Sequence, residues 1–332
     1  MIHSGTDPAA IAEAARLIRS GELVGLPTET VYGLGADASN DTAVALIFAA
    51  KGRPPKHPLI VHIAQAQQVL DYASSVPPFA ARLIAAFWPG PLTLILPRKP
   101  GVATATAGGQ DSIGLRCPSH PVAQALLKAC RTGVAGPSAN RFGRVSPTTA
   151  AHVVDEMGDA LFVLDGGPCD VGIESTIVDC TRGQPVLLRP GVLTRAQLEA
   201  ACGEAVLDKE TLASTAPRAS GTLASHYAPN AKVRLMGKAE LQKALAALPN
   251  NTAVTAPVAV YAYSMSDLSA INLASVLYRA MPLQASQVAH ELFAVLREFD
   301  AQGVAQIWVE TLPATADWDG VQDRLTRAAA PL

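Results

Sequence analysis

The 332-residue chain has few aromatic residues, few charges and no long hydrophobic run. Aromatic residues make up 5% and charged residues 16% of the chain, against 49% hydrophobic residues. This composition excludes a disordered chain and is typical of a globular protein with a well-formed core. No apolar run approaches the roughly 20 residues that a membrane span needs, and none follows Met1. We therefore expect a cytoplasmic protein with no part in the membrane.

The sequence also lacks the cysteine and histidine patterns of metal or redox sites. The five cysteines form no C-x-x-C pair, and the seven histidines form no H-x-x-x-H or H-x-H cluster. We expect reduced thiols and no metal site built from these residues. The net charge of −2 argues against a surface that binds nucleic acid all over, but it allows a local basic cleft.

Several well-known catalytic motifs are missing as well. The chain contains no G-x-x-x-x-G-K-[ST] phosphate loop, no G-x-G-x-x-G, no G-x-S-x-G and no close pair of carboxylates. The polar residues expected at strand ends are instead mostly cations, hydroxyls and amides. Such a site fits phosphoryl or nucleotidyl transfer, in which positioning and charge neutralisation supply most of the rate.

The strongest local signal is the basic stretch K-G-R-P-P-K-H-P-L-I-V-H at residues 51–62. Its prolines fix φ and remove backbone donors, which predicts a stiff connector, not a helix, before an apolar strand at about 59–63. Lys51 and Arg53 on this connector can neutralise phosphate oxygens, one as a point charge and the other as a planar fork. A solvated basic loop is the alternative for this stretch taken alone.

Four further segments place polar residues in or after predicted strands. The loop at 27–35 offers two threonines, a glutamate and a tyrosine, and the turn at 137–140 offers Ser138 and Asn140 without bulk. Arg116 and Arg189 lie in or at the end of apolar runs. Each segment alone also fits a plain turn or a surface ion pair, so the residues by themselves predict only that the chain binds an anionic, nucleotide-like ligand.

Alternating helix and strand signals favour an α/β layer fold with two domains. We place the first at residues 5–203 and a smaller α/β domain with a mainly parallel sheet at 231–332. Residues 204–230 show no helical or strand period and are predicted to be a linker. Within the first domain we expect Asp41 to cap a helix that runs into Lys51.

Taken together, six segments resemble the threonylcarbamoyl-AMP synthase family in its long form. They are P-T-E-T-V-Y-G-L-G (27–35), K-G-R-P-P-K-H-P-L (51–59), P-S-A-N (137–140) with S-P-T (146–148), E-S-T-I-V-D (174–179), L-R-P-G (188–191) and H-Y-A-P (226–229). The resemblance implies a YrdC-like catalytic domain, with a twisted mixed sheet and a concave basic cleft. It also implies a linker over the active site and a Rossmann-like C-terminal domain.

The same resemblance implies a reaction in which L-threonine, bicarbonate and ATP give L-threonylcarbamoyladenylate and pyrophosphate. The enzyme would be a nucleotidyltransferase. A downstream tRNA threonylcarbamoyl transferase then modifies the tRNA adenosine next to the anticodon; the resemblance leaves open whether this chain binds tRNA directly. ATP is a substrate that brings Mg²⁺ with it, and no tightly bound metal or organic cofactor is expected.

The family's pattern also assigns residues. L-threonine is expected near Thr30, His62, Arg116, Gly136 and Ser175. ATP is expected near Lys51, Arg53, His57, Ser112, Ser138, Asn140, Ser146, Arg189 and Tyr227, with Lys51 and Arg53 as the catalytic cations. Three positions depart from the pattern: His57 stands where asparagine is common, Gly136 where alanine is usual, and Ser112 where threonine is common. The first departure bears on an ATP contact, and the other two change little beyond a methyl group.

Two other functions compete with this hypothesis. One is a non-catalytic module that holds structured RNA on a basic concave surface, which the net charge and the scarcity of aromatic residues near the cations disfavour. The other is a carbamoyltransferase-type relative that uses the same cleft for another substrate. Pyrophosphate release that depends on both threonine and bicarbonate distinguishes the three.

Overall fold

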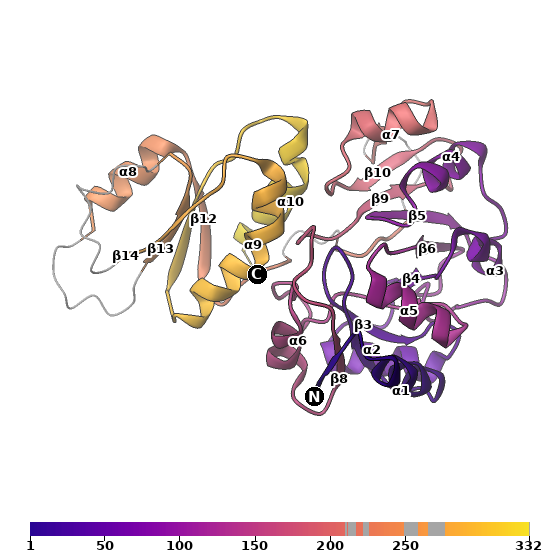
Figure 1. The fold of residues 1–332 in the computed structure, drawn as a ribbon. Helices are drawn as coiled ribbons and strands as arrows, with labels where there is room; N and C mark the ends of the chain where they lie inside the picture. The colour runs from indigo at the N-terminus through magenta and orange to yellow at the C-terminus, as the bar shows by residue number, and fades with distance from the viewer. Residues whose placement is uncertain (210, 212–216, 222–225, 249–257, 265–275, 332) are drawn as a thin grey trace. The chain divides into compact units, whose positions relative to one another are not determined.

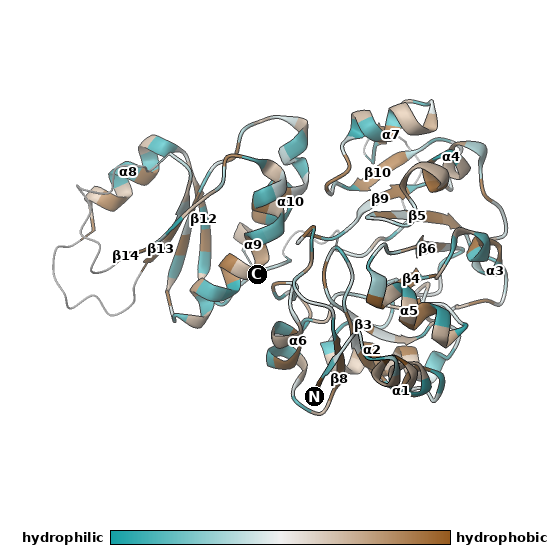
Figure 2. Ribbon diagram, viewed as in Figure 1, coloured by the Kyte–Doolittle hydropathy of each residue, from teal (hydrophilic) through white to brown (hydrophobic). Residues whose placement is uncertain are grey.

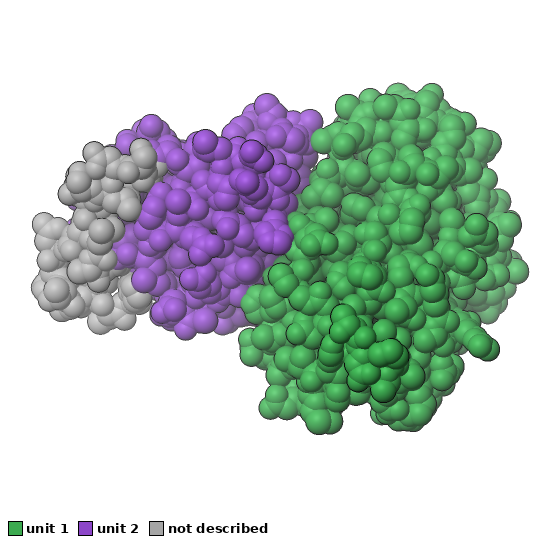
Figure 3. Space-filling model, viewed as in Figure 1, with its two compact units in different colours: residues 1–142, 146–222 green, residues 143–145, 223–332 purple. Residues whose placement is uncertain are grey.

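The computed structural model describes the chain except residues 210, 212–216, 222–225, 249–257, 265–275 and 332. The described chain divides into two compact units (Figure 1, Figure 3). Unit 1 contains residues 1–142 and 146–222, and unit 2 contains residues 143–145 and 223–332. The linker expected at 204–230 includes residues 210, 212–216 and 222–225, which lie outside the described residues.

An 11-stranded mixed sheet forms the centre of unit 1, in the order β1-β8-β2-β3-β7-β4-β6-β5-β9-β10-β11. The strands are β1 (Ile2–Ser4), β2 (Val24–Leu26), β3 (Gly33–Asp37), β4 (Ile60–His62), β5 (Leu92–Pro97), β6 (Ser112–Arg116), β7 (Val134–Ala135), β8 (Phe162–Asp165), β9 (Thr176–Asp179), β10 (Val186–Arg189) and β11 (Leu207–Asp208). β4 runs parallel to β6 and antiparallel to β7. The prediction of an α/β fold with a mixed sheet is confirmed.

The helices of unit 1 mostly begin where capping residues predict. They are α1 (Pro8–Arg19), α2 (Asp41–Lys51), α3 (Val69–Tyr72), α4 (Pro78–Phe87), α5 (Pro121–Cys130), α6 (Ala150–Met157) and α7 (Arg195–Cys202), with a 3-10 turn, η1, at Ala66–Gln68. The prediction that Asp41 caps α2 is wrong. Asn40 is the cap, because its side chain accepts hydrogen bonds from the N–H groups of Thr42 and Ala43.

Three other local predictions need correction. Lys51 lies on the last turn of α2, not on an irregular connector, and the chain leaves the helix at Gly52, whose φ of 63° is left-handed. The loop expected at 27–35 ends earlier, because β3 begins at Gly33. The expected linker contains the short strand β11, which pairs in parallel with β10. Pairing partners distant in the chain stabilise such short strands, so local sequence patterns miss them.

Unit 1 buries its apolar residues on both faces of the sheet. Leu94 and Ile95 are consecutive residues of β5, so their side chains point to opposite faces, and they are 0% and 5% exposed. Figure 2 shows brown hydrophobic residues along β5, whereas a helix such as α5 carries both brown and teal residues. This is the pattern expected of central strands covered on two sides and of helices that cover them.

Unit 2 is a smaller α/β unit with a parallel four-stranded sheet in the order β12-β15-β13-β14. Its elements are β12 (Lys232–Met236), α8 (Lys238–Ala246), β13 (Val258–Ala262), β14 (Val276–Ala280), α9 (Ala285–Ala301), β15 (Gln306–Glu310), the 3-10 turn η3 (Ala316–Trp318) and α10 (Asp319–Ala329). The prediction of a mainly parallel sheet is confirmed. The sequence analysis did not predict β14.

Candidate functional site

Two neighbouring strands carry residues expected to bind threonine. His62 ends β4 and Arg116 ends β6, and the two are register partners in a parallel pair, so their side chains lie on the same face. Arg116 Nη1 donates a hydrogen bond to Thr30 Oγ1 (2.7 Å), and His62 Nε2 lies 3.2 Å from the Gly136 carbonyl oxygen. The structure therefore brings together Thr30, His62, Arg116 and Gly136, which we call the amino-acid half of the site.

His62 is held as a neutral acceptor. Its Nε2 carries the proton, because the Gly136 carbonyl oxygen can only accept. Burial, and then the charge of Arg116, lowers the pKa of His62 to about 3. Its Nδ1 is buried and finds no donor among the described residues. This nitrogen can accept a hydrogen bond from a ligand hydroxyl or ammonium group.

Gly136 leaves room for this histidine. A Cβ atom at position 136 would lie 2.6 Å from His62 Cδ2, closer than two carbon atoms can approach. The absence of a side chain at this position therefore allows the observed position of the His62 ring. Glycine in place of the family's usual alanine at position 136 therefore affects the packing of His62. The sequence had led us to expect no effect beyond the loss of a methyl group.

Arg116 is anchored on three sides within unit 1. Its Nε donates to the Gly90 carbonyl oxygen (3.2 Å), its Nη1 donates to Thr30, and its Nη2 lies 2.8 Å from Oε2 of Glu29. The Arg116 and Glu29 side chains are 4% and 6% exposed, so this ion pair is buried. Burial raises the pKa of Glu29, but the charge of Arg116 and the hydrogen-bonding interactions with Arg116 and the backbone N–H groups of Glu29 and Ser119 together hold this pKa below its usual value. Glu29 is therefore ionised at neutral pH.

Thr30 is oriented by a short hydroxyl relay. Thr28 Oγ1 donates to the Val31 carbonyl oxygen (2.7 Å), so its own proton is used. The 2.9 Å contact between the two threonine hydroxyls must then run from Thr30 to Thr28. Thr30 Oγ1 thus presents lone pairs to Arg116, which fixes one edge of the guanidinium.

Ser175 connects the two halves of the site. Arg189 Nη2 donates to its carbonyl oxygen (2.8 Å), and Thr93 Oγ1 lies 2.7 Å from its hydroxyl. The next residue, Thr176, donates its N–H to Pro91, which follows the Gly90 that accepts from Arg116. Ser175 therefore lies between Arg189 and the loop that holds Arg116, although no described hydrogen bond joins it to Thr30, His62 or Arg116.

The residues expected to bind ATP gather around α2, β10 and the turn after β7. Lys51 Nζ donates to the carbonyl oxygens of Ser138 and Asn140. Burial, and then the charge of Arg53, lowers the pKa of Lys51 well below its usual value. An anionic ligand beside Lys51 would favour its charged form and so raise this pKa. We call Lys51, Arg53, Ser138, Asn140, Arg189 and Ser112 the nucleotide half of the site.

Arg53 and His57 share an aromatic neighbour on the basic stretch. Arg53 Nη2 donates to the Pro58 carbonyl oxygen (2.9 Å), and its guanidinium carbon lies 5.8 Å from the centroid of the Phe142 ring. The His57 ring meets the same phenylalanine edge-on at 5.7 Å. The contact with the Phe142 ring and the hydrogen bond to the Pro58 carbonyl oxygen together hold Arg53 in one orientation.

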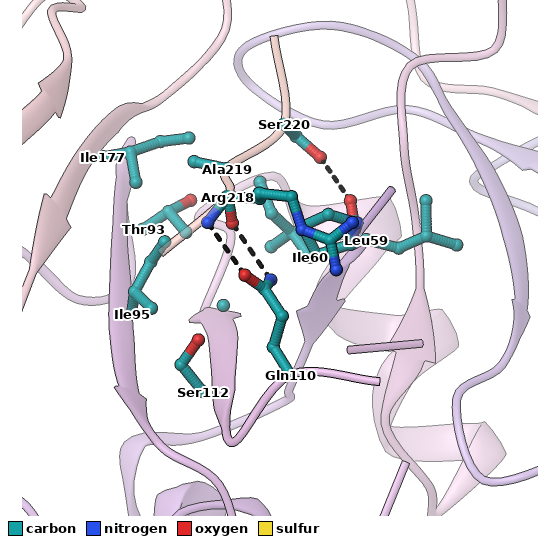
Figure 4. A pocket seen from close by; sticks show the side chains of 12 residues that line it. Leu59, Ile60, Thr93, Ile95, Gln110, Ser112, Ile177, Arg218, Ala219 and Ser220 are labelled. Atoms are coloured by element: carbon teal, nitrogen blue, oxygen red, sulfur yellow. Dashed lines mark hydrogen bonds between the residues drawn. The ribbon is translucent and has the colours of Figure 1, made fainter. Parts of the chain in front are cut away.

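Residues 218–220 lie over Ser112 and the neighbouring strands of the sheet (Figure 4). Gln110 binds the backbone of Arg218 in both directions, with its Oε1 accepting at 2.8 Å and its Nε2 donating at 3.2 Å. The carbonyl oxygen of Ser220 accepts from Arg189 Nη1 (3.0 Å), and its hydroxyl accepts from Arg53 Nη2 (3.3 Å). The space left beneath the segment is about 10 Å³, which is at the limit for one water molecule.

Two further residues expected to bind ATP are buried. Ser146 is fully buried, and its hydroxyl donates to the carboxylate of Glu174. Tyr227 belongs to unit 2, where it is buried against the Phe293 ring at 5.5 Å and lies beneath Arg324 at 5.3 Å. Its assignment to ATP stays a prediction.

Several residues in this cluster were not expected from the sequence. Glu29 stands inside the P-T-E-T motif, so the sequence could have pointed to it. Only the fold shows that it is the partner of Arg116. Glu174 likewise stands inside the E-S-T-I-V-D motif, whereas Thr93 and Gln110 carried no signal beyond their polarity. Among the described residues, no group of three histidine, cysteine or acidic side chains could hold a metal ion.

Comparison with known proteins decides the family. A family model described as "Telomere recombination" matches residues 16–191, and one described as "Threonylcarbamoyl-AMP synthase, C-terminal domain" matches residues 193–330. A threonylcarbamoyl-AMP synthase from Bacillus subtilis is 40% identical over 330 residues, which cover 98% of this chain and 94% of the relative. The chain belongs to the threonylcarbamoyl-AMP synthase family.

Other members of the threonylcarbamoyl-AMP synthase family agree over most of the chain. A synthase from Pyrococcus abyssi is 37% identical and covers 95% of this chain and 93% of its own length. A crystal structure of a P. abyssi relative complexed with L-threonine superposes with a TM-score of 0.85 at 36% identity, covering 96% of this chain and 94% of that one. No helix in the described part of the chain combines the length and apolar character needed to cross a bilayer.

Proposed function

We propose that this chain is a threonylcarbamoyl-AMP synthase, which forms L-threonylcarbamoyladenylate and pyrophosphate from L-threonine, bicarbonate and ATP. The observation that carries the proposal is the continuous set of contacts through Ser175. These contacts join the cation-rich nucleotide half to the amino-acid half within one unit. The full-length similarity to named synthases, and the similarity to a structure complexed with L-threonine, support the same function.

The amino-acid half suits threonine. The guanidinium of Arg116, held by Gly90, Thr30 and Glu29, can bind the substrate carboxylate through its remaining N–H groups, and a neutral imidazole can accept from the side-chain hydroxyl. We assign Thr30, His62, Arg116, Gly136 and Ser175 to threonine. Because His62 is neutral, it adds no charge that would repel the substrate ammonium group.

The nucleotide half suits a triphosphate. We assign Lys51 and Arg53 to charge neutralisation, with His57, Ser112, Ser138, Asn140, Ser146, Arg189 and Tyr227 as further ATP contacts. ATP brings Mg²⁺ as part of the substrate. Arg189 and Arg53 now bind Ser220, and the space at Ser112 holds at most one water molecule, so a nucleotide there requires residues 218–220 to move.

The reaction needs no nucleophile from the protein. The threonine nitrogen first gains a carboxylate from bicarbonate, with loss of water. An oxygen of this carbamate then attacks the α-phosphorus of ATP, and pyrophosphate leaves. This is a nucleotidyl transfer, in which the protein supplies orientation and charge neutralisation. We propose that it takes place in the cytoplasm, and that a tRNA threonylcarbamoyl transferase consumes the product.

The domain organisation follows from this assignment. We propose residues 5–203 as the catalytic domain, residues 204–230 as a linker over the active site, and residues 231–332 as the Rossmann-like C-terminal domain. The hydrogen bonds of residues 218–220 to Gln110, Arg53 and Arg189 support a linker that reaches the site.

Pyrophosphate release from ATP tests the function. We expect release that requires both L-threonine and bicarbonate, together with a product of the mass of L-threonylcarbamoyladenylate. Release that proceeds equally well without threonine would refute the proposal. Activity with carbamoyl phosphate would favour a carbamoyltransferase-type relative, and tight tRNA binding without any turnover would favour the RNA module.

A further inference from the structure

Glu29 is a buried carboxylate in the amino-acid half that the assignments above do not use. Its Oε2 lies 2.8 Å from Nη2 of Arg116, and both side chains are almost completely buried. Glu29 follows β2 directly in the chain, beside Thr30, which binds the same guanidinium. One cation and one anion therefore lie side by side where the proposed substrate binds, and His62 beside them is neutral.

The carboxylate of Glu29 has unused capacity to accept hydrogen bonds. The N–H groups of Glu29 and Ser119 face it and lower its pKa, but neither they nor Arg116 make an aligned hydrogen bond to it among the described residues. A carboxylate can accept about four hydrogen bonds. His62 Nδ1 is a second buried acceptor without a donor. Two buried acceptors of the amino-acid half, the Glu29 carboxylate and His62 Nδ1, therefore lack an aligned donor among the described residues, although Arg116 Nη2 lies 2.8 Å from Glu29 Oε2. Buried acceptors of this kind are normally satisfied.

L-threonine carries the missing donors on its ammonium and hydroxyl groups. We propose that Glu29 binds the α-ammonium group of L-threonine, so that the Arg116–Glu29 pair recognises the two charged ends of a zwitterionic amino acid. This inference rests on the proposed function and adds to it a residue that selects the substrate class. Glu29 is assigned to binding, and no proton transfer is assigned to it.

A simpler role would make Glu29 only the counter-ion of a buried arginine, because an unpaired buried charge is costly. The two roles predict different responses to the charge of the ligand. If Glu29 binds the ammonium group, its removal weakens a zwitterion and favours a simple anion, since Arg116 is then uncompensated. If Glu29 only holds Arg116 in place, its removal weakens both ligands by the same factor.

The experiment measures binding of two ligands by calorimetry at pH 7.5, with and without a non-hydrolysable ATP analogue. The ligands are L-threonine and the 2,3-dihydroxybutanoate of the same stereochemistry, in which a hydroxyl replaces the ammonium group. We expect the wild-type protein to prefer threonine by about tenfold or more, as charge-assisted hydrogen bonds are stronger than neutral ones. In Glu29→Gln we expect threonine affinity to fall about tenfold and dihydroxybutanoate affinity to hold or rise.

Controls keep the test decisive. Glu13→Gln removes the same charge from an exposed ion pair with Arg16 and is expected to leave both affinities unchanged. Equal losses for both ligands in Glu29→Gln would overturn the inference. If that variant does not fold, the wild-type comparison still decides, because equal affinity for the two ligands would refute recognition of the ammonium group.

The outcome can be separated from that of the proposed function. If the wild-type protein releases pyrophosphate with threonine but binds the hydroxy acid equally well, the proposed function is supported and the role of Glu29 is refuted. If the protein binds neither threonine nor ATP, both the proposed function and the role of Glu29 are refuted.

Discussion

The amino-acid half and the nucleotide half hold their cations against different partners. Arg116 lies against the carboxylate of Glu29, whereas the cations of the nucleotide half donate to backbone carbonyl oxygens. Lys51 donates hydrogen bonds to the carbonyl oxygens of Ser138 and Asn140, and Arg53 donates to that of Pro58. Arg189 donates to the carbonyl oxygens of Ser175 and Ser220. A carboxylate cancels the charge of its partner, but a carbonyl dipole only orients it. The first arrangement suits a zwitterion, and the second suits a polyanion.

The largest expected effect comes from the nucleotide half. Lys51→Ala or Arg53→Ala should weaken ATP binding by about 100-fold or more, because each variant removes a charge fixed next to the phosphate groups. Calorimetry with a non-hydrolysable ATP analogue measures this. Lys56→Ala is the matched control, since Lys56 lies exposed on the same stretch and should change the affinity little. Unchanged ATP affinity in Lys51→Ala or Arg53→Ala would contradict the assignment.

A somewhat smaller effect should separate the two halves. Arg116→Lys keeps the positive charge but loses the planar fork, and we expect the KM for threonine to rise about 50-fold while the KM for ATP changes less than about threefold. Threonine-dependent pyrophosphate release gives both constants. If both constants rise equally, the division of the site into two halves is wrong.

The neutral histidine of the amino-acid half predicts a pH dependence of stability. An unfolded chain protonates His62 near pH 6.5, whereas the folded protein does so only near pH 3. Between these values the unfolded state binds the extra proton, so acid destabilises the fold. From pH 7.5 to pH 5, wild-type protein should lose about 2 kcal/mol more unfolding free energy than His62→Gln. Urea unfolding of both proteins at the two pH values tests this, and equal losses would count against a neutral His62.

Gly136→Ala tests how closely the amino-acid half is packed. The new Cβ would lie 2.6 Å from the His62 ring, so the ring must shift and lose its contact with the carbonyl oxygen of residue 136. We expect a loss of about 1–2 kcal/mol in unfolding free energy, together with weaker threonine binding. Gly143→Ala is a poor control because its φ is positive, so Gly237→Ala, with open space around its Cα, serves instead. A variant as stable as wild type would show that the ring moves freely.

The smallest expected effect concerns residues 218–220, which lie over the nucleotide half. Gln110→Ala removes two hydrogen bonds to the Arg218 backbone, so the segment should leave its position more easily. We expect ATP to bind about threefold more tightly, and a protease to cut the segment faster without ATP and threonine. Weaker ATP binding would instead make these residues part of the bound nucleotide site.

Much of the fold could be predicted because its signals are local. Asp7 and Thr194, residue types that are common at the N-cap, cap α1 and α7 through their side chains. Prediction failed where distant pairing decides the structure. β11 and β14 are stabilised by neighbouring strands. The choice between two adjacent capping residues was also missed: Asn40 has an extended backbone and accepts from Thr42 and Ala43, and Asp41 is the first helical residue. The resemblance to known motifs supplied the site residues that local patterns alone left open.

In the candidate site, too, the sequence predicted residues, and the fold decided which of them are in contact. The family's pattern predicted Thr30, His62 and Arg116 for threonine, but the Arg116–Glu29 pair depends on the approach of β6 to the loop after β2. The same pattern predicts an ATP contact for Tyr227, which stays a prediction; only the fold shows that its ring packs against Phe293 in unit 2. These contacts join residues far apart in the chain, and no periodicity encodes them.

By itself, the sequence determined the family, the α/β class and the kind of side chains that the site would use, because motifs and hydrophobic periods are properties of neighbouring residues. Only the tertiary structure decided which of those side chains meet. It paired Arg116 with Glu29, made His62 neutral by burying it beside an arginine, and set Ser220 on Arg53 and Arg189. Charge and protonation depend on the surroundings of a group, and folding alone creates those surroundings.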